Sequence, residues 1–410
     1  MDLKNRDSSN RHVVIQAFTV PLSLRFLNGQ PAFWQKQGYE VHILTSQGEH
    51  LADWIAQNQL IYHPIPFQRS VSIFNELRCL YLLVRYFLKV KPSIVHGNTP
   101  KAAFLSLFAA WIARVPVRVY EMHGLPLETA VGWRREGWRW VEKIACALAT
   151  QTIAVSESLR TAVLENRLVE AHKILTIQQG SCNGVDAESD FNPEKINLEE
   201  ARKMRQKWGL RPHNQVVGFV GRLTEQKGID ELQRAWQTIK LSYPDARLLM
   251  VGEGDQREPL PANLRQKLRE EPTILLIGHV EKMANYYALM DFLVLPSHRE
   301  GFGNVVIEAA AMGKAAVVSR VTGLKNAVLE NKTGLFCEAK NVESLTEQIL
   351  FYLANPAVAQ AHGQAARLRV QSDFCPESVW LAKLGLYELL IARVRGVSLP
   401  HVSPFLQTVS

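Results

Sequence analysis

Short apolar segments alternate with amphipathic helical segments along almost the whole chain of 410 residues. Strand-like runs separated by helices indicate parallel sheets covered by helices on both faces, with ligands at the carboxyl ends of the strands. The expected strands are residues 13–18, 41–45, 93–96, 117–122, 152–155 and 173–177, then 216–220, 247–251, 274–277, 292–296, 315–319 and 334–337. Two such series predict an α/β protein with two doubly wound domains.

The domain boundary is expected in the polar stretch 186–213, which lies directly before a new strand. We therefore place an N-terminal domain at residues 1–190, a C-terminal domain at 191–375 and a final segment at 376–410. Within the final segment, VWLAKLGLYELLIARV (residues 379–394) has the pattern of an amphipathic helix.

Composition limits the classes of protein that the chain can belong to. With 47% hydrophobic and 21% charged residues, the chain is globular. Its five cysteines are scattered and lack CxxC spacing, which favours a reducing compartment over a disulfide framework or a zinc site. The polar start, MDLKNRDSSNRH, lacks a signal-peptide pattern, and no uncharged apolar run reaches the roughly 18 residues that a membrane span needs.

Most of the net charge of +8 falls in the first part of the chain, where residues 1–180 hold 20 Lys and Arg against 13 Asp and Glu. A basic first half indicates an anionic surface or an anionic acceptor. No helix-turn-helix, zinc-finger or RNP pattern accompanies this charge, so we expect no nucleic-acid partner.

The sequence REGFGNVVIEAAAMG, residues 299–313, contains two glutamates around a glycine turn. An apolar strand precedes it and a helical pattern follows Gly303, so the N–H groups of the turn can bind an anion or sugar oxygens. Glu300 falls in the turn. Glu308 falls in the second turn of the helix, where a carboxylate needs donors such as vicinal ribose hydroxyls. The alternative is that Glu308 only complements the helix dipole.

A second strand-to-helix crossover has the sequence GRLTEQKG, residues 221–228. Arg222 and Lys227 both lie in this loop, beside the N-terminus of the following helix. Two cations next to the positive end of a helix dipole form a diphosphate site. A local pair of one of them with Glu225 is the alternative.

The sequence VGEGD, residues 251–255, begins like a GxGxxG fingerprint but has Arg257 in place of the last glycine. It also follows the phosphate-like loop instead of opening the domain. We therefore do not expect redox dinucleotide binding. The segment can instead form a tight turn that lines a nucleotide pocket. No Walker loop, HExxH or GxSxG pattern occurs.

In order and spacing, GRLTEQKG, VGEGD, LPSHREGFGNVVIEAAAMGKAAV and NKTGLF resemble the retaining glycosyltransferases of family GT4, which have the GT-B fold. The resemblance covers most of residues 213–340, and the E-x7-E motif of the family falls on Glu300 and Glu308. In the first half, VHGNTPKAAF, EMHGLPLETAVGWRR and QQGSCNGVD resemble a branch that builds capsular, lipopolysaccharide and exopolysaccharide glycans on lipid carriers. The resemblance also implies that the C-terminal helix crosses back to the first domain.

By this resemblance, the C-terminal domain binds a nucleotide-sugar. Arg222 and Lys227 hold the diphosphate and stabilise its charge as it leaves, which is the largest catalytic contribution available. Glu308 accepts hydrogen bonds from the ribose, and Glu300 holds the transferred sugar. The other residues implied to line the donor site are Gly221, Gly252, Gly254, Gly301, Phe302, Gly303 and Asn304.

The first domain is implied to bind the acceptor. His123, in EMHG, follows a strand and resembles the family histidine near the donor sugar; a purely structural histidine is the alternative. The residues placed to meet an acceptor phosphate are Thr19, Ser23, Arg25, Asn98, Thr99 and Lys101. Two departures from the family pattern occur, since TVPLS (residues 19–23) replaces a Gly-Gly pair and Asn326 replaces a glutamate.

The expected function is transfer of a hexose or N-acetylhexosamine, with retention of configuration, from a nucleotide-sugar to a lipid-linked or glycan acceptor in surface polysaccharide synthesis. By its resemblance to this branch, the chain is expected to use a UDP-linked donor. Arg222 and Lys227 make a metal unnecessary for charge balance, so we expect no metal and no cofactor. A catalytically silent GT-B partner subunit and a nucleotide-sugar epimerase stay open as alternatives.

The sequence WRREGWRWVEKIACALA, residues 133–149, predicts binding to a membrane face. At helical spacing, one stripe contains Arg135, Arg139 and Lys143, and another contains Trp133, Trp140, Val141, Ile144 and Leu148. Cations flanked by tryptophans are typical of an interfacial helix on anionic lipid. An ordinary domain helix with a solvated basic face is the alternative. With the implied lipid-linked acceptor, this predicts a cytoplasmic protein bound peripherally to the inner face of the cytoplasmic membrane.

Overall fold

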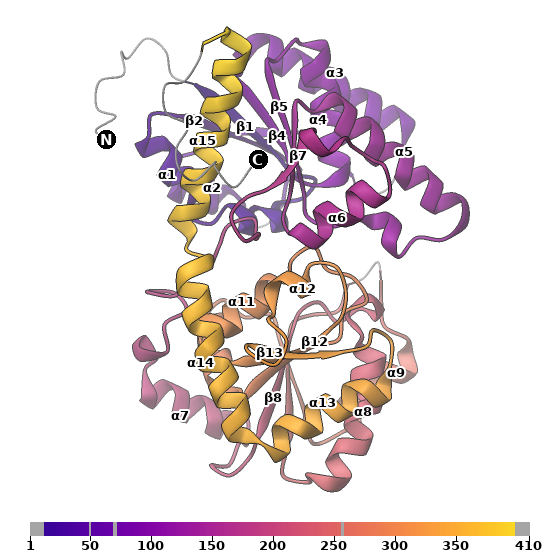
Figure 1. The fold of residues 1–410 in the computed structure, drawn as a ribbon, viewed down its shortest axis with the longest axis vertical. Helices are drawn as coiled ribbons and strands as arrows, with labels where there is room; N and C mark the ends of the chain where they lie inside the picture. The colour runs from indigo at the N-terminus through magenta and orange to yellow at the C-terminus, as the bar shows by residue number, and fades with distance from the viewer. Residues whose placement is uncertain (1–11, 49–50, 69–71, 256–257, 398–410) are drawn as a thin grey trace. The chain divides into compact units, whose positions relative to one another are not determined.

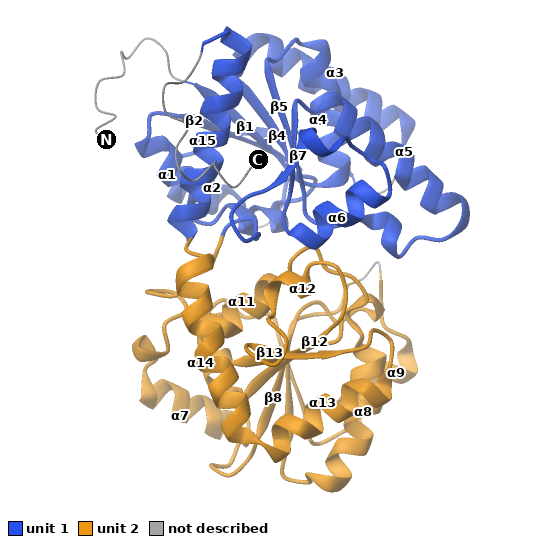
Figure 2. Cartoon of the chain, in the orientation of Figure 1, with its two compact units in different colours: residues 1–183, 376–410 blue, residues 184–375 orange. Residues whose placement is uncertain are grey.

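The computed structural model describes residues 12–48, 51–68, 72–255 and 258–397. The chain forms two compact units, unit 1 with residues 1–183 and 376–410 and unit 2 with residues 184–375 (Figure 2). The expected boundary after residue 190 lies a few residues beyond this division. The polar N-terminal stretch 1–11 and Arg257 lie outside the described residues.

Unit 1 contains a seven-stranded parallel sheet in the order β3-β2-β1-β4-β5-β6-β7 (Figure 1). In the centre of the sheet, Val14 of β1 pairs with Val41 of β2 and with Ile94 of β4. The inner strands are buried on both faces, which explains their nearly continuous apolar sequences. The strands are β1 (Val13–Ala17), β2 (Glu40–Thr45), β3 (Ile61–Pro64), β4 (Ile94–Gly97), β5 (Val117–Met122), β6 (Gln151–Ala154) and β7 (Ile174–Thr176).

Helices cover both faces of this sheet. One hydrophobic cluster joins the strands to α1, α2 and α15, and a second joins them to α3 and α4. Val14 belongs to the first cluster and Ile15 to the second, because successive side chains of a strand point to opposite faces. The helices are α1 (Gln30–Lys36), α2 (Leu51–Gln57), α3 (Ile73–Val90), α4 (Pro100–Ile112), α5 (Gly132–Leu148), α6 (Glu157–Glu165) and α15 (Pro376–Arg395).

The C-terminal helix α15 packs within unit 1. Val379 and Leu386 are almost fully buried in the cluster that contains Val117 of β5. The ring of Tyr387 lies edge-on to that of Trp34, with centroids 5.3 Å apart. A segment distant in sequence therefore completes the core of this unit.

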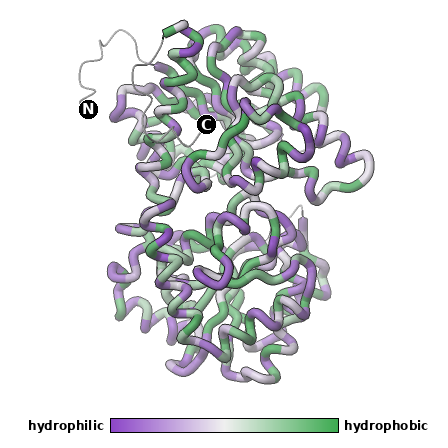
Figure 3. The backbone as a smooth tube through the Cα atoms, in the orientation of Figure 1, coloured by the Kyte–Doolittle hydropathy of each residue, from purple (hydrophilic) through white to green (hydrophobic). Residues whose placement is uncertain are grey.

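Unit 2 contains a six-stranded parallel sheet in the order β10-β9-β8-β11-β12-β13. Figure 3 shows hydrophobic strands in the centre of the unit and more polar residues along its outer helices. The strands are β8 (Val216–Val220), β9 (Arg247–Val251), β10 (Ile274–Gly278), β11 (Phe292–Leu295), β12 (Ala315–Ser319) and β13 (Gly334–Cys337). The helices are α7 (Leu198–Lys207), α8 (Ile229–Ser242), α9 (Ala262–Glu270), α10 (Met283–Leu289), α11 (Asn304–Ala311), α12 (Leu324–Ala327), α13 (Val342–Ala354) and α14 (Pro356–Asp373).

All twelve expected strands are present, and their ends agree with the structure within one residue. The sequence analysis missed β3. This strand forms the edge of the sheet and pairs only with β2. Its four residues are exposed or half-buried, so they lack the continuous apolar run that identifies an inner strand.

A buried carboxyl group connects α5 to the sheet of unit 1. Glu142 is completely buried, and its Oε2 accepts a hydrogen bond of 2.7 Å from the Tyr120 hydroxyl. Its Oε1 has no hydrogen-bond partner among the described residues. Burial raises the pKa of Glu142 to about 7, and the hydrogen bond from Tyr120 only partly opposes this shift.

Glu142→Gln is expected to change how stability depends on pH. Because the folded protein keeps a proton that the unfolded chain releases, wild-type stability should fall as the pH rises from 4.5 to about 7. Relative to Glu142→Gln, the wild-type free energy of unfolding should drop by roughly 3 kcal/mol over this range. Urea unfolding at several pH values measures the difference, with Glu136→Gln, an exposed acid of the same helix, as control. A difference independent of pH would contradict the prediction.

Candidate functional site

The loop after β8 contains the two cations identified in the sequence. Arg222 follows the strand, and Lys227 ends a short 3-10 turn directly before α8. Gly228 joins this turn to the helix in the left-handed conformation, with a φ of 71°. A Cβ on Gly228 would lie 2.1 Å from the carbonyl oxygen of Pro296. The loop therefore packs closely against the end of β11, and this approach requires a glycine.

Lys227 forms an ion pair with Glu300, which lies in the loop after β11. Glu300 Oε1 also accepts a hydrogen bond of 2.9 Å from the hydroxyl of the fully buried Ser297. The two loops are joined through the backbone as well, since His298 N donates to the carbonyl of Gln226 at 2.9 Å. The fold thus brings together two predicted site residues that are 73 positions apart.

The VGEGD segment packs against the same loop. Gly252 has a φ of 139°, and a Cβ on it would lie 1.9 Å from the carbonyl oxygen of Gly221. Gly254 forms an isolated bridge with Leu223. Arg222 Nη1 lies 2.7 Å from Asp255 Oδ2. The expected tight turn is present, and the acid that pairs with Arg222 is Asp255 rather than Glu225.

Helix α11 begins at the glycine turn between the two glutamates. Gly303 precedes Asn304 in the left-handed conformation, with a φ of 89°. Gly301 packs against Gly323, on which a Cβ would lie 2.5 Å from the Gly301 carbonyl. The Phe302 side chain is buried and packs on Phe374, with ring centroids 5.3 Å apart. Only the backbone of Phe302 is therefore available to a ligand.

Glu308 lies in the second turn of α11 and is half-buried. Its Oε2 accepts a hydrogen bond of 2.8 Å from the hydroxyl of Tyr287 in α10. The Tyr287 ring is fully buried, so this donor has a fixed position and orients the carboxylate. Complementing the helix dipole does not by itself account for this contact.

The sequence analysis missed several side chains that hold these groups. Ser297 and His298 lie in the loop after β11 and could have been selected from that position alone. His298 Nε2 lies 2.9 Å from Glu231 Oε1. Burial would raise the pKa of Glu231, but the hydrogen bond with His298 holds it below its usual value. Tyr287 carries no local signal, because its contact with Glu308 exists only in the folded chain.

In unit 1, the loops after β1 and β4 bring two predicted acceptor-side residues together. Thr19 Oγ1 lies 2.7 Å from Thr99 Oγ1, and Thr19 N donates to the same Thr99 oxygen at 2.9 Å. Ser23 and Arg25 lie nearby in sequence, in a 3-10 segment (Pro21–Leu27). Arg25 is exposed and stands over the Phe26 ring at 5.5 Å.

Asn98 and Lys101 both have partners inside unit 1, and their contact with an acceptor phosphate stays a prediction. The Asn98 side chain is buried, and its Nδ2 donates to Gln16 Oε1 at 2.8 Å. Lys101 Nζ lies 2.5 Å from Glu76 Oε1 in α3, and both side chains are largely buried. The amide and the ammonium therefore serve the packing of unit 1 in this structure.

His123 follows β5 at the carboxyl edge of the sheet. Its imidazole stacks on the Phe26 ring, with centroids 4.7 Å apart. Burial lowers the pKa of His123 to about 4, although the charge of Glu121 opposes the shift, so the imidazole is neutral at pH 7. His123 Nε2 has no hydrogen-bond partner among the described residues.

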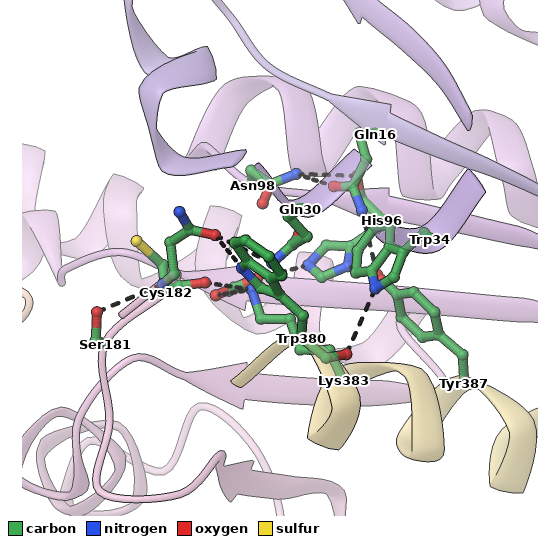
Figure 4. A network of polar contacts seen from close by, with 12 residues as sticks. Gln16, Gln30, Trp34, His96, Asn98, Ser181, Cys182, Trp380, Lys383 and Tyr387 are labelled. Atoms are coloured by element: carbon green, nitrogen blue, oxygen red, sulfur yellow. Dashed lines mark hydrogen bonds and ion pairs between the residues drawn. The ribbon is translucent and has the colours of Figure 1, made fainter. Parts of the chain in front are cut away.

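A buried polar network attaches α15 to the sheet of unit 1 (Figure 4). Lys383 Nζ donates to both oxygens of Glu121, at 2.9 and 2.7 Å, and to the carbonyl of Cys182 at 2.7 Å. Burial would raise the pKa of Glu121, but Lys383 and a hydrogen bond with His96 hold it well below its usual range. All three hydrogens of the ammonium are thus used inside the unit.

The network continues as a chain of hydrogen bonds along the ends of the strands. The Tyr387 hydroxyl lies 2.5 Å from His96 Nδ1 and accepts from Gln16 Nε2 at 3.2 Å. At the end of the first segment of unit 1, Asn183 Oδ1 accepts a hydrogen bond of 2.7 Å from Trp380 Nε1 of α15. Sequence reasoning did not identify this network, because its members are spread over five segments of the chain.

Comparison with known proteins gives two family matches. Residues 200–369 match the family described as Glycosyl transferases group 1, and residues 32–180 match the Glycosyl transferase 4-like domain. The chain is 32% identical to the capsular polysaccharide biosynthesis glycosyltransferase CapM of Staphylococcus aureus over 383 residues, which are 93% of this chain and 98% of that protein. It is 25% identical over 319 residues, 76% of this chain and 79% of that protein, to the Escherichia coli UDP-Gal:alpha-D-GlcNAc-diphosphoundecaprenol alpha-1,3-galactosyltransferase.

Solved structures share the fold. A glycosyltransferase from Rickettsia africae ESF-5 has a TM-score of 0.77 at 22% identity, covering 93% of this chain and 99% of that one. Anabaena Alr3699/HepE, solved in complex with UDP and glucose, has a TM-score of 0.77 at 18% identity, covering 93% of this chain and 100% of that one.

Proposed function

The chain belongs to the group 1 glycosyl transferases of family GT4 and has the GT-B fold, and from this premise we infer that it moves a hexose or N-acetylhexosamine from a UDP-linked donor to a lipid-linked or glycan acceptor. The pathway proposed is surface polysaccharide synthesis, and the name of the Staphylococcus aureus relative, which refers to capsular polysaccharide biosynthesis, supports it. Support for UDP comes from the Escherichia coli relative, named for UDP-Gal, and from the Anabaena protein solved with UDP. Support for a lipid carrier comes from the diphosphoundecaprenol in the name of the Escherichia coli relative.

The Lys227–Glu300 pair is the observation that carries the donor half of this proposal. It places a cation from the loop after β8 beside a carboxylate from the loop after β11. As the glycosidic bond breaks with retention of configuration, negative charge grows on the leaving diphosphate and positive charge on the sugar. Lys227 and Arg222 stabilise the negative charge on the diphosphate. Glu300 stabilises the positive charge on the sugar and accepts hydrogen bonds from the sugar hydroxyls.

The remaining roles are proposed for each unit separately. In unit 2, the first N–H groups of α11 beside Gly303 bind sugar oxygens, and Glu308 accepts hydrogen bonds from the ribose. In unit 1, the Thr19–Thr99 pair and the neutral His123 belong to the acceptor side. His123 Nε2, which has no hydrogen-bond partner among the described residues, suits a substrate hydroxyl, because a neutral imidazole nitrogen can donate or accept one hydrogen bond without carrying a charge.

Glu308→Ala is expected to weaken binding of free UDP by roughly 1–3 kcal/mol, because ribose hydroxyls in the site lose their acceptor. Titration calorimetry measures the affinity. Glu347→Ala provides a control, since Glu347 is an exposed acid on α13. Unchanged affinity in a folded Glu308→Ala protein would show that Glu308 does not bind the nucleoside.

Sugar transfer itself is tested with the purified protein and a panel of UDP-, GDP- and ADP-sugars. A donor at a hundred times its dissociation constant should stabilise the protein by about 2.7 kcal/mol in a thermal-shift assay, which identifies the nucleotide. Transfer from that donor to lipid extracted from membranes should then depend on Lys227. Absence of both donor hydrolysis and transfer would indicate a silent partner subunit. Release of a free epimerised sugar nucleotide would indicate an epimerase.

We also propose that unit 1 binds the membrane face that contains the acceptor. No helix in the described part of the chain combines the length and hydrophobicity that a bilayer crossing requires. Helix α5 lies at the outer edge of unit 1 (Figure 1), and its residues 132–138 are exposed around the whole helix. Lys143 Nζ stands over the Trp140 ring at 5.7 Å, so cations and tryptophans share one surface.

Replacing Arg135, Arg139 and Lys143 together by glutamate is expected to abolish flotation of the protein with anionic vesicles. Each cation contributes about 1 kcal/mol near an anionic surface, and the attraction weakens with salt. The same triple reversal at Arg265, Lys267 and Arg269, which are exposed on α9, changes the net charge equally and should leave flotation intact. Equal recovery with neutral and anionic vesicles would contradict this prediction.

A further inference from the structure

Helix α3 exposes large apolar side chains that the described residues of unit 1 leave accessible. Its buried side chains Cys79, Leu83 and Phe87 pack into the core against α4 and the sheet. On the exposed side, Phe74 has 87% of its surface accessible, and Leu77, Tyr81 and Leu88 have 59%, 62% and 57%. A helix that packs one apolar face in a core is expected to present polar residues on the other, so this second apolar face needs a separate explanation.

The exposed residues of α3 divide into two adjacent stripes. At 3.6 residues per turn, Leu77, Leu88, Tyr81 and Phe74 fall within about 60° of the helix circumference. Arg85, Arg78 and Lys89 fall within the next 60° or so, and all three are exposed. The apolar stripe is therefore bordered lengthwise by a stripe of positive charge.

Within α3 itself, no acidic side chain lies on the outer face beside these cations. Glu76 is the only acid in the helix, and it pairs with Lys101 of α4 on the inner side. Helix α5 repeats the arrangement, since Trp133, Trp140 and Ile144 are exposed beside its cations. Helices α3 and α5 both pack against α4, whose final residues Trp111 and Ile112 are also exposed.

We infer that the exposed face of α3 is a second membrane contact, whose apolar stripe enters the headgroup and acyl boundary of an anionic bilayer while its three cations bind the lipid headgroups. This inference rests on the proposed membrane attachment through α5 and extends it to a footprint formed by two helices. A protein partner fits the surface less well, because the cores of protein interfaces are depleted of charge. Long cationic side chains beside rings and branched side chains instead match an interfacial helix, in which lysine and arginine reach up to the headgroups.

A fluorescent probe at one position of the stripe tests whether it enters lipid. Leu77→Cys is labelled with an environment-sensitive fluorophore in a Cys375→Ser background, since the other four cysteines are buried. Vesicles with anionic lipid should shift the emission to the blue. Leu198→Cys is the matched control, because Leu198 is 81% exposed on α7 of unit 2, and its probe should not shift. Equal emission from the two probes, with the protein bound to the vesicles, would overturn the inference.

Flotation tests whether the stripe contributes to binding. Leu77→Ser combined with Leu88→Ser should weaken partitioning into anionic vesicles at least tenfold, because two side chains lose their burial in lipid. Leu198→Ser combined with Leu241→Ser is the control, since both leucines are highly exposed in unit 2, and it should partition like the wild type. Unchanged partitioning of the α3 variant would reject the inference. A wild-type dimer that the α3 variant abolishes, without any vesicle binding, would identify a second copy of the chain as the occupant instead.

These outcomes are separable from failure of the proposed function. The α3 variant should keep the wild-type affinity for free UDP, because the substituted leucines lie in unit 1 and the donor residues lie in unit 2. If the wild-type protein did not bind a nucleotide-sugar donor, the proposed function would be contradicted, but the lipid contact would not be affected. Binding of wild-type protein to vesicles that depends on α5 cations but not on α3 leucines would leave the proposed attachment in place and reject only the second contact.

Discussion

Replacement of Lys227 by alanine is expected to lower kcat by about a hundredfold or more while weakening UDP binding much less. The ammonium lies beside Glu300, between the loops that follow β8 and β11. Its interaction with the donor strengthens as the diphosphate takes up charge during bond cleavage, so its loss acts mainly on the transition state. Removing one preorganised electrostatic contact to a developing anion costs about 10²–10³ in kcat in other enzymes.

Steady-state kinetics of sugar transfer, together with calorimetry of free UDP, separate the two effects. Lys240→Ala is a suitable control, because Lys240 also pairs with a glutamate, Glu271, at 2.5 Å but lies in the last turn of α8, at the opposite end from the loop that contains Lys227. It should keep wild-type kcat. A fall in kcat for Lys227→Ala that is matched by an equal loss of UDP affinity would mean that Lys227 binds the ground state and has no special role in the transition state.

Lys383→Met is expected to destabilise unit 1 by about 3–5 kcal/mol, because it leaves the buried carboxylate of Glu121 without its cation. Both side chains of the pair are at most 2% exposed, so water cannot replace the lost contacts. Methionine has a similar length to lysine and limits the additional effect of a cavity. Hydrogen exchange followed by mass spectrometry should show faster exchange in β4 and β5, which contain His96 and Glu121, and unchanged exchange in unit 2.

The double variant Lys383→Met with Glu121→Gln separates charge from packing. It should recover a large part of the lost stability, since no uncompensated charge remains in the core. Arg202→Ala, which removes the exposed pair with Glu199 on α7, should change the free energy of unfolding by less than about 1 kcal/mol. If Lys383→Met were as mild as Arg202→Ala, the network around Lys383 would not be what holds α15 to the sheet.

The order of strands and helices could be predicted from the sequence because it depends on local patterns. An inner strand such as β8, buried on both sides, has an apolar sequence that is recognisable without its neighbours. Arg222, Lys227 and Glu300 were selected by the same reasoning, since each lies in a loop that follows a strand, whereas Glu308 was selected as a carboxylate within the next helix. The edge strand β3 lacked this signal and was missed.

Only the tertiary structure decided which of these side chains meet. Lys227 and Glu300 are 73 positions apart, and Lys383 and Glu121 are 262 positions apart, so neither contact leaves a local trace in the sequence. The orientation of helix α3 could not be read from its sequence either, because the helix is apolar around much of its circumference. The packing of Leu83 and Phe87 against the core determined that Phe74, Leu77 and Tyr81 face outward. Local sequence determines which element forms, but the burial of each face and the partner of each charge depend on contacts between segments that are distant in the chain.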